Sequence, residues 1–266
     1  MTLLREVAVR PSAREQSGYP FDLPLIRALP VLDLSAPVTL LVGENGSGKS
    51  TVLEAIAASV GSVTIGGAPA ATDPTLAPAR RLADCLTLTW TRKTRLGFFM
   101  RAEDFITWTR QSGELLGELD EIAEAARTFQ GEGGGDWWRA WGLARGERAA
   151  LERSLGDDFD ARSHGESFLD LFQRRLRDGG LHLLDEPETP LSPQRQLALL
   201  ALIRDTAARG GQFVIATHSP ILLACPGATI LHFADGAIAP VHYDDVPNVR
   251  LMRDFLNDPA AFLRYL

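Results

Sequence analysis

Cysteine is scarce in this chain of 266 residues, and long apolar runs are lacking. The two cysteines, Cys85 and Cys225, lie far apart without metal-ligand or redox spacing, so we interpret both as small buried hydrophobic residues and expect no zinc site. No apolar stretch approaches the roughly 20 residues that span a bilayer. Met1 is followed by charged Arg5 and Glu6 instead of a signal-peptide core. We therefore expect a cytoplasmic protein without a membrane span.

Positive charge is also in short supply, and the deficit is local. The formal net charge is -7, and residues 101–160, with 14 Asp and Glu against 7 Arg, account for the whole excess. Phosphate backbones and anionic lipids would repel this acidic segment, so nucleic acid is not the favoured partner. A basic cluster opposes this interpretation, although its commoner meaning is a solvated turn between two strands. The cluster comprises Arg80, Arg81, Arg92, Lys93 and Arg95.

Only two lysines are present, and one of them, Lys49, lies in a glycine-rich run. Residues 43–51 have the sequence GENGSGKST, which matches the P-loop pattern of Gly, four residues and then Gly-Lys-Ser. Residues 38–42 form an apolar, β-branched run typical of a buried strand, and apolar residues recur at helical spacing after the loop. A glycine turn that caps an ordinary helix is the simpler alternative, but it does not explain the lysine or the flanks. The pattern predicts a phosphate-binding loop.

Each position of this loop has an expected role. Its glycines let successive backbone N–H groups turn toward an anion, and the helix dipole adds partial positive charge. Lys49 would neutralise the outer phosphates, the Ser50 hydroxyl would ligate magnesium, and Thr51 would lie near the inner phosphates. The predicted nucleotide-binding residues here are Gly43, Asn45, Gly46, Ser47, Gly48, Lys49, Ser50 and Thr51.

Two later strand ends carry the remaining candidate residues. A buried strand near residues 181–184 ends in Asp185 and Glu186, and another near 212–216 is followed by His218. Asp185 would complete the magnesium shell beside Ser50, while Glu186 would orient and deprotonate water beyond the γ-phosphate. His218 could hydrogen-bond the γ-phosphate or the attacking water. A helix cap for the carboxylates and a structural role for the histidine are the simpler alternatives.

The order of elements indicates an α/β fold in one domain, residues 1–266, with a helical lobe inserted at about 104–160. Helices are expected over 103–112, 114–129 and from 147 to 155, with Trp137, Trp138 and Trp141 in the lobe core. The other expected elements are strands near 3–9, 85–90, 96–100, 228–233 and 237–242, a loop over 60–79, and helices over 193–208 and from 249 and 259.

Two further segments have both a structural and a functional interpretation. Ser163 and Glu166 form a capping box before an amphipathic helix, which is a structural reason for both residues. Tyr19 or Phe21, ahead of the P-loop, could stack on adenine, although aromatic residues there are more often core.

Taken in order, residues 43–51, 163–167, 185–188 and 217–219 resemble the Walker A, signature, Walker B and switch-histidine motifs of ATP-binding cassette (ABC) ATPases. Nearly the whole chain is covered, and the soluble SMC- and RecF-like branch, with its small bacterial AAA-family ATPases of a single cassette, looks most similar. The resemblance implies a P-loop NTPase core with a β-subdomain and an inserted helical lobe, binding ATP and Mg²⁺.

The resemblance also implies a head-to-tail homodimer that sandwiches two ATP molecules, in which Ser163 and Gly165 face the γ-phosphate bound by the other copy. Glu103 stands at about the place of the family's middle glutamine, which couples to partner proteins. Thr189 to Ser192 replaces the family's usual aspartate after Walker B.

Four functions therefore stay open at this point. The first is an ATP hydrolase that cycles between an ATP-bound dimer and monomers and acts on an unknown effector protein. The second is the ATP-binding subunit of a membrane transporter, and the third is a DNA maintenance or defence ATPase. A small-molecule kinase is the fourth. The positions of Glu186 and His218 disfavour it, and the sequence shows no acceptor site.

Overall fold

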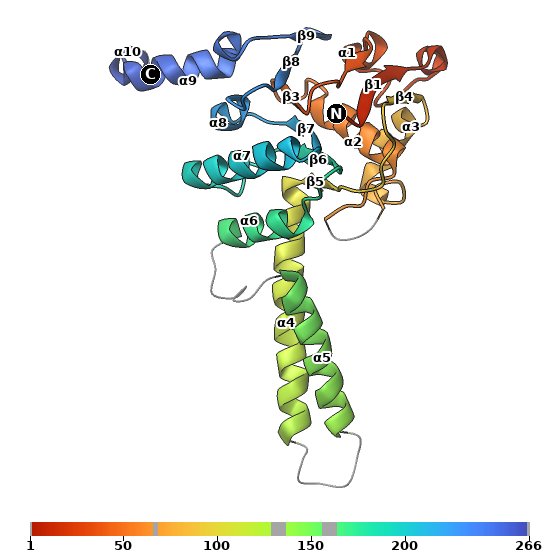
Figure 1. Cartoon of the computed structure of the whole chain (residues 1–266), viewed down its shortest axis with the longest axis vertical. Coiled ribbons are helices and arrows are strands. Elements are labelled where there is room, and N and C mark those ends of the chain that lie inside the picture. The colour runs from red at the N-terminus through yellow and green to blue at the C-terminus, as the bar shows by residue number, and fades with distance from the viewer. Residues whose placement is uncertain (1, 66–68, 129–136, 156–163, 265–266) are drawn as a thin grey trace. The chain divides into compact units, whose positions relative to one another are not determined.

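The computed structural model describes residues 2–65, 69–128, 137–155 and 164–264, which divide into two compact units (Figure 1). The first, which we call the α/β unit, comprises Met1–Ala102 and Arg175–Leu266. The second, the helical unit, comprises Glu103–Arg174. Its boundary lies beyond residue 160, where the predicted lobe ends, because it includes nearly all of a third helix.

Two sheets, both in the α/β unit, contain the strands of the described residues. A three-stranded antiparallel sheet has the order β2 (Leu32–Asp33), β1 (Leu4–Val9), β4 (Leu86–Trp90). A six-stranded sheet has the order β5 (Phe99–Arg101), β6 (Leu181–Asp185), β7 (Gln212–Ala216), β3 (Val38–Gly43), β8 (Thr229–Ala234), β9 (Ala237–Pro240). All of its neighbours pair in parallel except β9, which is antiparallel to β8. The carboxyl ends of β3, β6 and β7 therefore meet at one edge, where α/β sheets bind ligands.

The three central strands have the composition of strands that are covered on both faces. Every residue of β3, β6 and β7 is buried. Their uninterrupted apolar and β-branched runs suit parallel strands, which are shielded on both sides. The α/β fold predicted from these runs is confirmed.

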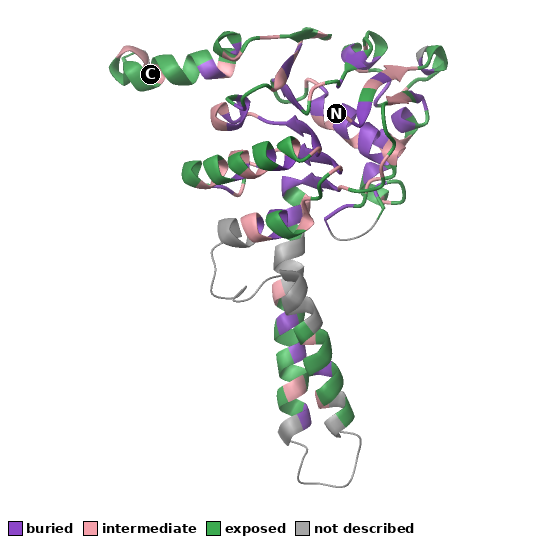
Figure 2. Ribbon diagram, in the orientation of Figure 1, coloured by how far each residue is buried: buried purple, intermediate pink, exposed green. Residues whose placement is uncertain are grey.

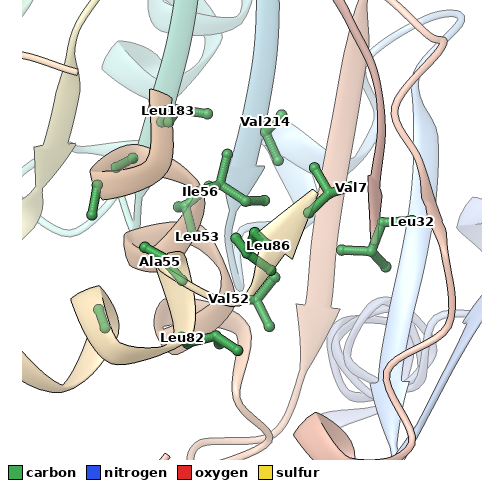
Figure 3. Packing of buried hydrophobic residues seen from close by; sticks show 14 of the residues in the cluster. Val7, Leu32, Val52, Leu53, Ala55, Ile56, Leu82, Leu86, Leu183 and Val214 are labelled. Atoms are coloured by element: carbon green, nitrogen blue, oxygen red, sulfur yellow. The ribbon is translucent and has the colours of Figure 1, made fainter. Parts of the chain in front are cut away.

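Helix α2 (Lys49–Val60), which follows the P-loop, is part of a core shared by both sheets (Figure 3). Val52, Leu53 and Ile56 on its apolar side are almost fully buried. They belong to one cluster with Val7 of β1 and Val214 of β7. Both sheets therefore share a core with α2, the helix that begins at Lys49, and this core supports the P-loop from more than one side.

A buried glutamine adds a polar connection between the sheets. The Oε1 atom of Gln212 accepts from the backbone N–H groups of Leu3 (2.9 Å) and Leu4 (2.7 Å). Its Nε2 atom donates to the carbonyl oxygens of Leu4 (2.7 Å) and Leu34 (2.6 Å). Gln212 begins β7, and Leu4 begins β1, so one side-chain amide ties the first strand of the chain to the central sheet.

The remaining helices of the α/β unit are mostly short. They are α1 (Pro24–Arg27), α3 (Ala77–Ala83), α7 (Pro193–Ala208), α8 (Pro220–Leu223), α9 (Pro247–Asn257), α10 (Pro259–Leu263) and the 3₁₀ turns η1 (Pro11–Glu15), η2 (Pro74–Leu76) and η5 (Tyr243–Asp245). The expectation of loop over residues 60–79 is wrong at its end, because η2 and the start of α3 lie there. Buried Leu76, Ala79 and Leu82 anchor this segment to the core, which the local proline and alanine content does not reveal.

The solvated basic turn predicted between two strands is confirmed for Arg92, Lys93 and Arg95, which are exposed and lie between β4 and β5. β4 pairs with β1 in the antiparallel sheet, whereas β5 pairs with β6 in the other sheet. Arg80 and Arg81 lie in α3, before either strand. These two arginines therefore do not belong to the turn.

The helical unit contains most of α4 (Ala102–Thr128), α5 (Trp137–Leu155) and most of α6 (His164–Arg175). The predicted break at residue 113 is wrong, since α4 is a single helix that continues through Gly113. An ion pair between Asp120 and Arg148 and a shared hollow lined by Leu119 and Ala144 place α4 and α5 side by side (Figure 1).

Two predicted core groups of the helical unit can be checked in part. Of the three lobe tryptophans, the structure describes only the side chain of Trp141, which is half-buried with the Arg145 guanidinium 5.0 Å from its ring centroid. On α6, Phe168 and Phe172 are fully buried, and Phe168 contacts Phe105 with ring centroids 4.6 Å apart. The amphipathic helix expected there is confirmed.

Cys85 and Cys225 are both buried and free, as predicted. Among the described residues, no helix combines the length and the apolar composition that crossing a bilayer requires.

Candidate nucleotide-binding site

The P-loop adopts a backbone path that only glycine allows at two positions. Gly43 has a φ of 156°, and a Cβ atom there would lie 2.3 Å from the carbonyl oxygen of Phe233. Gly48 has a φ of 97°, in the left-handed region, and a Cβ atom would lie 2.7 Å from Leu25 Cδ2. Because the loop is pressed against its neighbours on β8 and α1, substitution at either glycine would displace it.

Lys49 is buried at the start of α2 with its ammonium group folded back on the loop. Its Nζ atom donates to the carbonyl oxygens of Gly43 (2.8 Å) and Glu44 (2.9 Å). Burial lowers the pKa of the ammonium group, and the negative charges of Glu186 and Asp185 partly oppose that shift. A phosphate oxygen would be a charged acceptor in place of these neutral carbonyls, which makes its hydrogen bond to Lys49 stronger.

Ser50 and Asp185 bring two oxygen ligands together across the sequence. The Ser50 hydroxyl donates to Asp185 Oδ1 at 3.2 Å. Burial is the main cause that raises the pKa of Asp185 to about 7, and the Ser50 hydrogen bond opposes it. This hydrogen bond offsets only part of the cost of burying the negative charge of Asp185, so a nearby cation would stabilise the carboxylate. A hydroxyl and a carboxylate are oxygen ligands of the kind that Mg²⁺ binds. The residues present therefore fit the magnesium ion that the sequence predicted.

Glu186 and His218 face each other beside this pair. Glu186 has a φ of 49°, which is unusual for a residue other than glycine, and its N–H donates to Ala216 O at 2.9 Å. Strained backbone of this kind is often found at functional sites. His218 Nε2 lies 3.8 Å from Glu186 Oε1. Burial and the charge of Lys49 lower the pKa of His218, so its imidazole is neutral at neutral pH.

Two hollows border the loop. The first, about 390 Å³, is lined by Tyr19, Leu23, Asn45, Gly46, Gly48, Lys49, Ser50, Thr51 and Glu186. The second, about 770 Å³, is lined among others by Gly43, Asn45, Gly46, Ser47 and His218. Both volumes lie in the range of small-molecule sites. All the loop residues predicted to bind nucleotide thus border one hollow or the other.

The structure separates the two aromatic candidates for adenine stacking. Phe21 is 2% exposed and belongs to the core. Tyr19 is 53% exposed, and its hydroxyl lies 2.8 Å from Thr51 Oγ1. Of these two residues, only Tyr19 has a ring face available beside the loop.

The structure does not test the predicted signature and coupling residues. Ser163 lies outside the described residues, and Gly165 is in the first turn of α6. Glu103 is an exposed residue in the first turn of α4. Their roles stay predictions.

Two residues near His218 had no predicted role. Glu188 accepts a hydrogen bond from the His218 backbone N–H at 2.7 Å, and Asn248 donates one to the His218 carbonyl oxygen at 2.6 Å. Glu188 could have been suspected because it is the third carboxylate of the run that begins at Asp185. Asn248 carried no sequence signal, since it lies 30 residues beyond His218.

Comparison with known proteins also indicates an ATP-binding protein. Two protein-family models match, "AAA domain" over residues 26–112 and "AAA domain, putative AbiEii toxin, Type IV TA system" over residues 116–224. Similar chains include the hemin import ATP-binding protein HmuV of Burkholderia cenocepacia (strain HI2424), which is 31% identical over 226 residues, 76% of each chain. The thiamine import ATP-binding protein ThiQ of Mesorhizobium japonicum is 28% identical over 242 residues, 87% of this chain and 82% of that protein.

Among solved structures, a metal-chelate type ABC transporter in an inward-facing conformation aligns with a TM-score of 0.49 at 16% identity, over 97% of this chain and 90% of that one. The identity to HmuV over three quarters of both chains decides the family, and it agrees with the P-loop and carboxylate geometry described above. The chain belongs to the ABC-type P-loop ATPases, enzymes that bind and hydrolyse ATP.

Proposed function

We propose that the chain binds ATP with Mg²⁺ and hydrolyses it to ADP and phosphate between two copies of itself, each ATP being held by both. The main observation behind this proposal is that five side chains suited to the reaction lie together at the carboxyl ends of β3, β6 and β7. They are Lys49, Ser50, Asp185, Glu186 and His218. Ser50 Oγ lies 3.2 Å from Asp185 Oδ1, and His218 Nε2 lies 3.8 Å from Glu186 Oε1, with Lys49 beside them.

Binding begins with the loop. The Lys49 ammonium group exchanges its two carbonyl acceptors for phosphate oxygens, and the N-terminus of α2 adds the partial charge of its dipole. Thr51 lies close to the inner phosphates, and its hydroxyl already contacts the exposed Tyr19. Tyr19 supports the adenine ring of ATP by stacking on it.

Hydrolysis needs a base that can reach water beyond the γ-phosphate. Glu186 has the required carboxylate, and it accepts the proton of the attacking water as the bond to phosphorus forms. The neutral His218 imidazole donates a hydrogen bond to the γ-phosphate or orients the water. Ser50 and Asp185 would hold Mg²⁺, which neutralises charge on the phosphate oxygens when it is bound.

Exposure of the proposed catalytic pair supports the requirement for a second copy. In one copy the side chains of Glu186 and His218 are 42% and 34% exposed. Bulk water screens the charges of such a pair, and covering the pair strengthens its electrostatic interactions. In the proposed dimer, Ser163 and Gly165 of the other copy cover the γ-phosphate. The helical unit is then an insertion within one ATPase domain that spans residues 1–266.

Light scattering with the Glu186→Gln variant tests this proposal. Glutamine keeps the shape of the side chain but cannot take a proton, so the variant should bind ATP with Mg²⁺, fail to hydrolyse it and accumulate as a dimer. Wild type should be monomeric without ATP. A variant that stays monomeric while it binds a fluorescent ATP analogue normally would exclude the sandwich arrangement.

Two controls make the result specific. Adding Lys49→Ala to Glu186→Gln should abolish the dimer, because ATP can no longer bind. Glu15→Gln alters an exposed carboxylate outside the loop and should leave turnover and the oligomeric state as in wild type.

A second candidate function is the ATP-binding subunit of a membrane importer. The names of HmuV and ThiQ favour it. The test is to purify the tagged chain from membranes of its native host in mild detergent. A stoichiometric integral membrane partner that raises the ATP turnover of the chain would establish this role, and turnover unaffected by any such partner would leave the first proposal.

A further inference from the structure

The backbone of His218 is held from two sides by side chains that come from distant parts of the chain. Its N–H donates to Glu188 Oε1 at 2.7 Å, and its carbonyl oxygen accepts from Asn248 Nδ2 at 2.6 Å. A carbonyl oxygen can only accept, so this geometry requires the nitrogen of the Asn248 amide to face it. Glu188 follows β6, and Asn248 lies in the first turn of α9.

The next residue is anchored as well. The Ser219 hydroxyl donates to Gln196 Oε1 at 2.6 Å, and Gln196 Nε2 donates to Leu191 O at 3.1 Å. Gln196 belongs to α7. The strand end that carries His218 is therefore fixed to the segment after β6, to α7 and to α9 at once.

The His218 ring and the His218 backbone differ in their hydrogen bonding. The Nε2 atom of the ring is buried, has no hydrogen-bond partner among the described residues, and lies 3.8 Å from Glu186 Oε1. The ring also borders the hollow of about 770 Å³ beside the P-loop. A backbone fixed by hydrogen bonds, together with a ring nitrogen that has no hydrogen-bond partner in the described part of the chain, is the arrangement expected of a side chain that binds a ligand.

Fold stability alone does not explain Glu188. Its Oε2 atom is buried and has no partner among the described residues, and burying an incompletely bonded carboxylate costs free energy. A neutral acceptor would hold the His218 N–H at a lower cost.

We infer that Glu188 and Asn248 are positioning residues for His218, which set the place of its imidazole opposite Glu186, and that α9 thereby supports the hydrolysis step from the C-terminal part of the chain. This inference rests on the proposed role of His218. It assigns α9 a part in turnover through the hydrogen bond from Asn248 to the His218 carbonyl oxygen, and Asn248 itself also borders the hollow of about 770 Å³ beside the P-loop.

The test is a double-mutant cycle on ATP turnover and ATP affinity. Asn248→Asp keeps the size of the side chain but removes the donor, and Asn248→Ala removes it without adding charge. Either should lower kcat about tenfold with little change in the KM for ATP, because a small displacement of a catalytic group slows the chemical step more than it weakens binding. Glu188→Ala should behave similarly, and Glu188→Gln, which keeps an acceptor, should recover most of the turnover.

The decisive comparison is made in a His218→Ala background. If Asn248 acts through the imidazole, Asn248→Ala should cause no further loss once the imidazole is gone. An equal loss in both backgrounds would mean a merely structural role and would overturn the inference alone. Asn257→Asp, the same change at an exposed position of α9, is the matched control and should leave kcat unchanged.

Failure of the underlying proposal gives a different result. If His218→Ala turns over ATP like wild type, His218 has no role in hydrolysis and the inference falls with it. Circular dichroism and urea unfolding of each variant show whether it is folded before its kinetics are interpreted.

Discussion

The α/β unit and the helical unit bury their side chains in different ways (Figure 2). Three central strands of the α/β unit are buried at every residue, and several polar groups are buried with them. Arg101, for example, is 7% exposed and contacts Glu54 Oε1 at 3.4 Å and Thr75 Oγ1 at 2.9 Å. Each buried polar group needs its partners in place, so this unit specifies a detailed geometry.

The helical unit buries a narrower set of residues. On α4, Leu116 and Leu119 are buried, while Leu115 and Ile122 are 45% and 49% exposed. A 27-residue helix extends for about 40 Å, and its contacts with α5 run along one side. Substitutions in the α/β unit should therefore affect chemistry and global stability, whereas those along α4 and α5 of the helical unit should act locally.

The sharpest test of this contrast is Lys49→Ala in the α/β unit. Losing the charge that neutralises the outer phosphates should abolish ATP binding and reduce turnover by about a thousandfold or more. Nucleotide titration and steady-state phosphate release measure the two effects. The only other lysine, Lys93, is exposed, and Lys93→Ala should leave both unchanged. Retained ATP affinity in Lys49→Ala would contradict the proposed binding mode.

The Gln212→Leu variant tests whether the two sheets depend on one buried amide. The substitution leaves four backbone groups of Leu3, Leu4 and Leu34 without their partner. Since buried unsatisfied groups cost about 1–3 kcal/mol each and can partly relax, we expect a loss of about 4 kcal/mol in the free energy of unfolding. Urea unfolding measures it. Gln173→Leu, at an exposed position of α6, should cost far less.

These two variants also mark the limit of what the sequence predicts. The P-loop and the strands that end at Asp185 and Ala216 were located from the sequence because their apolar runs are uninterrupted and directly flank the motif residues. Asp185 is predicted beside Ser50 because a strand that ends in carboxylates downstream of a P-loop is expected to supply a magnesium ligand. The role of Gln212 could not be predicted, because its partners lie more than 170 residues away.

The errors have the same physical origin. The local sequence favoured a loop over residues 60–79, but burial of Leu76 and Ala79 in the core orders η2 and the start of α3 there. Gly113 suggested a break in α4, yet one glycine costs a helix only about 1 kcal/mol, which the helix absorbs. Asn248 and Glu188 became visible only when the fold brought them to the same peptide unit of His218.

A pH titration of stability probes a buried histidine of the α/β unit. Burial lowers the pKa of His182 to about 4, and its ring lies between Phe98 and Phe213. Because the unfolded chain binds the proton near pH 6.5 and the folded chain does not, stability present above pH 6.5 is lost as the pH falls toward 4. The difference corresponds to about 3 kcal/mol.

The His182→Leu variant removes this titrating group. Its free energy of unfolding should fall less steeply than that of wild type between pH 6.5 and 4, whatever its stability at neutral pH. His242→Leu, at an exposed histidine, should keep the wild-type slope. Identical slopes in wild type and His182→Leu would show that another group dominates acid unfolding.

The smallest effect is expected in the helical unit. Leu119 is 5% exposed and lines the hollow between α4 and α5, so Leu119→Ala should destabilise the pairing of these helices by about 2 kcal/mol. Hydrogen exchange of the α4 and α5 amides should accelerate accordingly, while ATP affinity stays unchanged. Ile122→Ala, at a half-exposed position of the same helix, should change exchange by less than about 0.5 kcal/mol. If Leu119→Ala instead weakened ATP binding, the two units would be energetically coupled, and the contrast between a chemical unit and a locally stabilised one would fail.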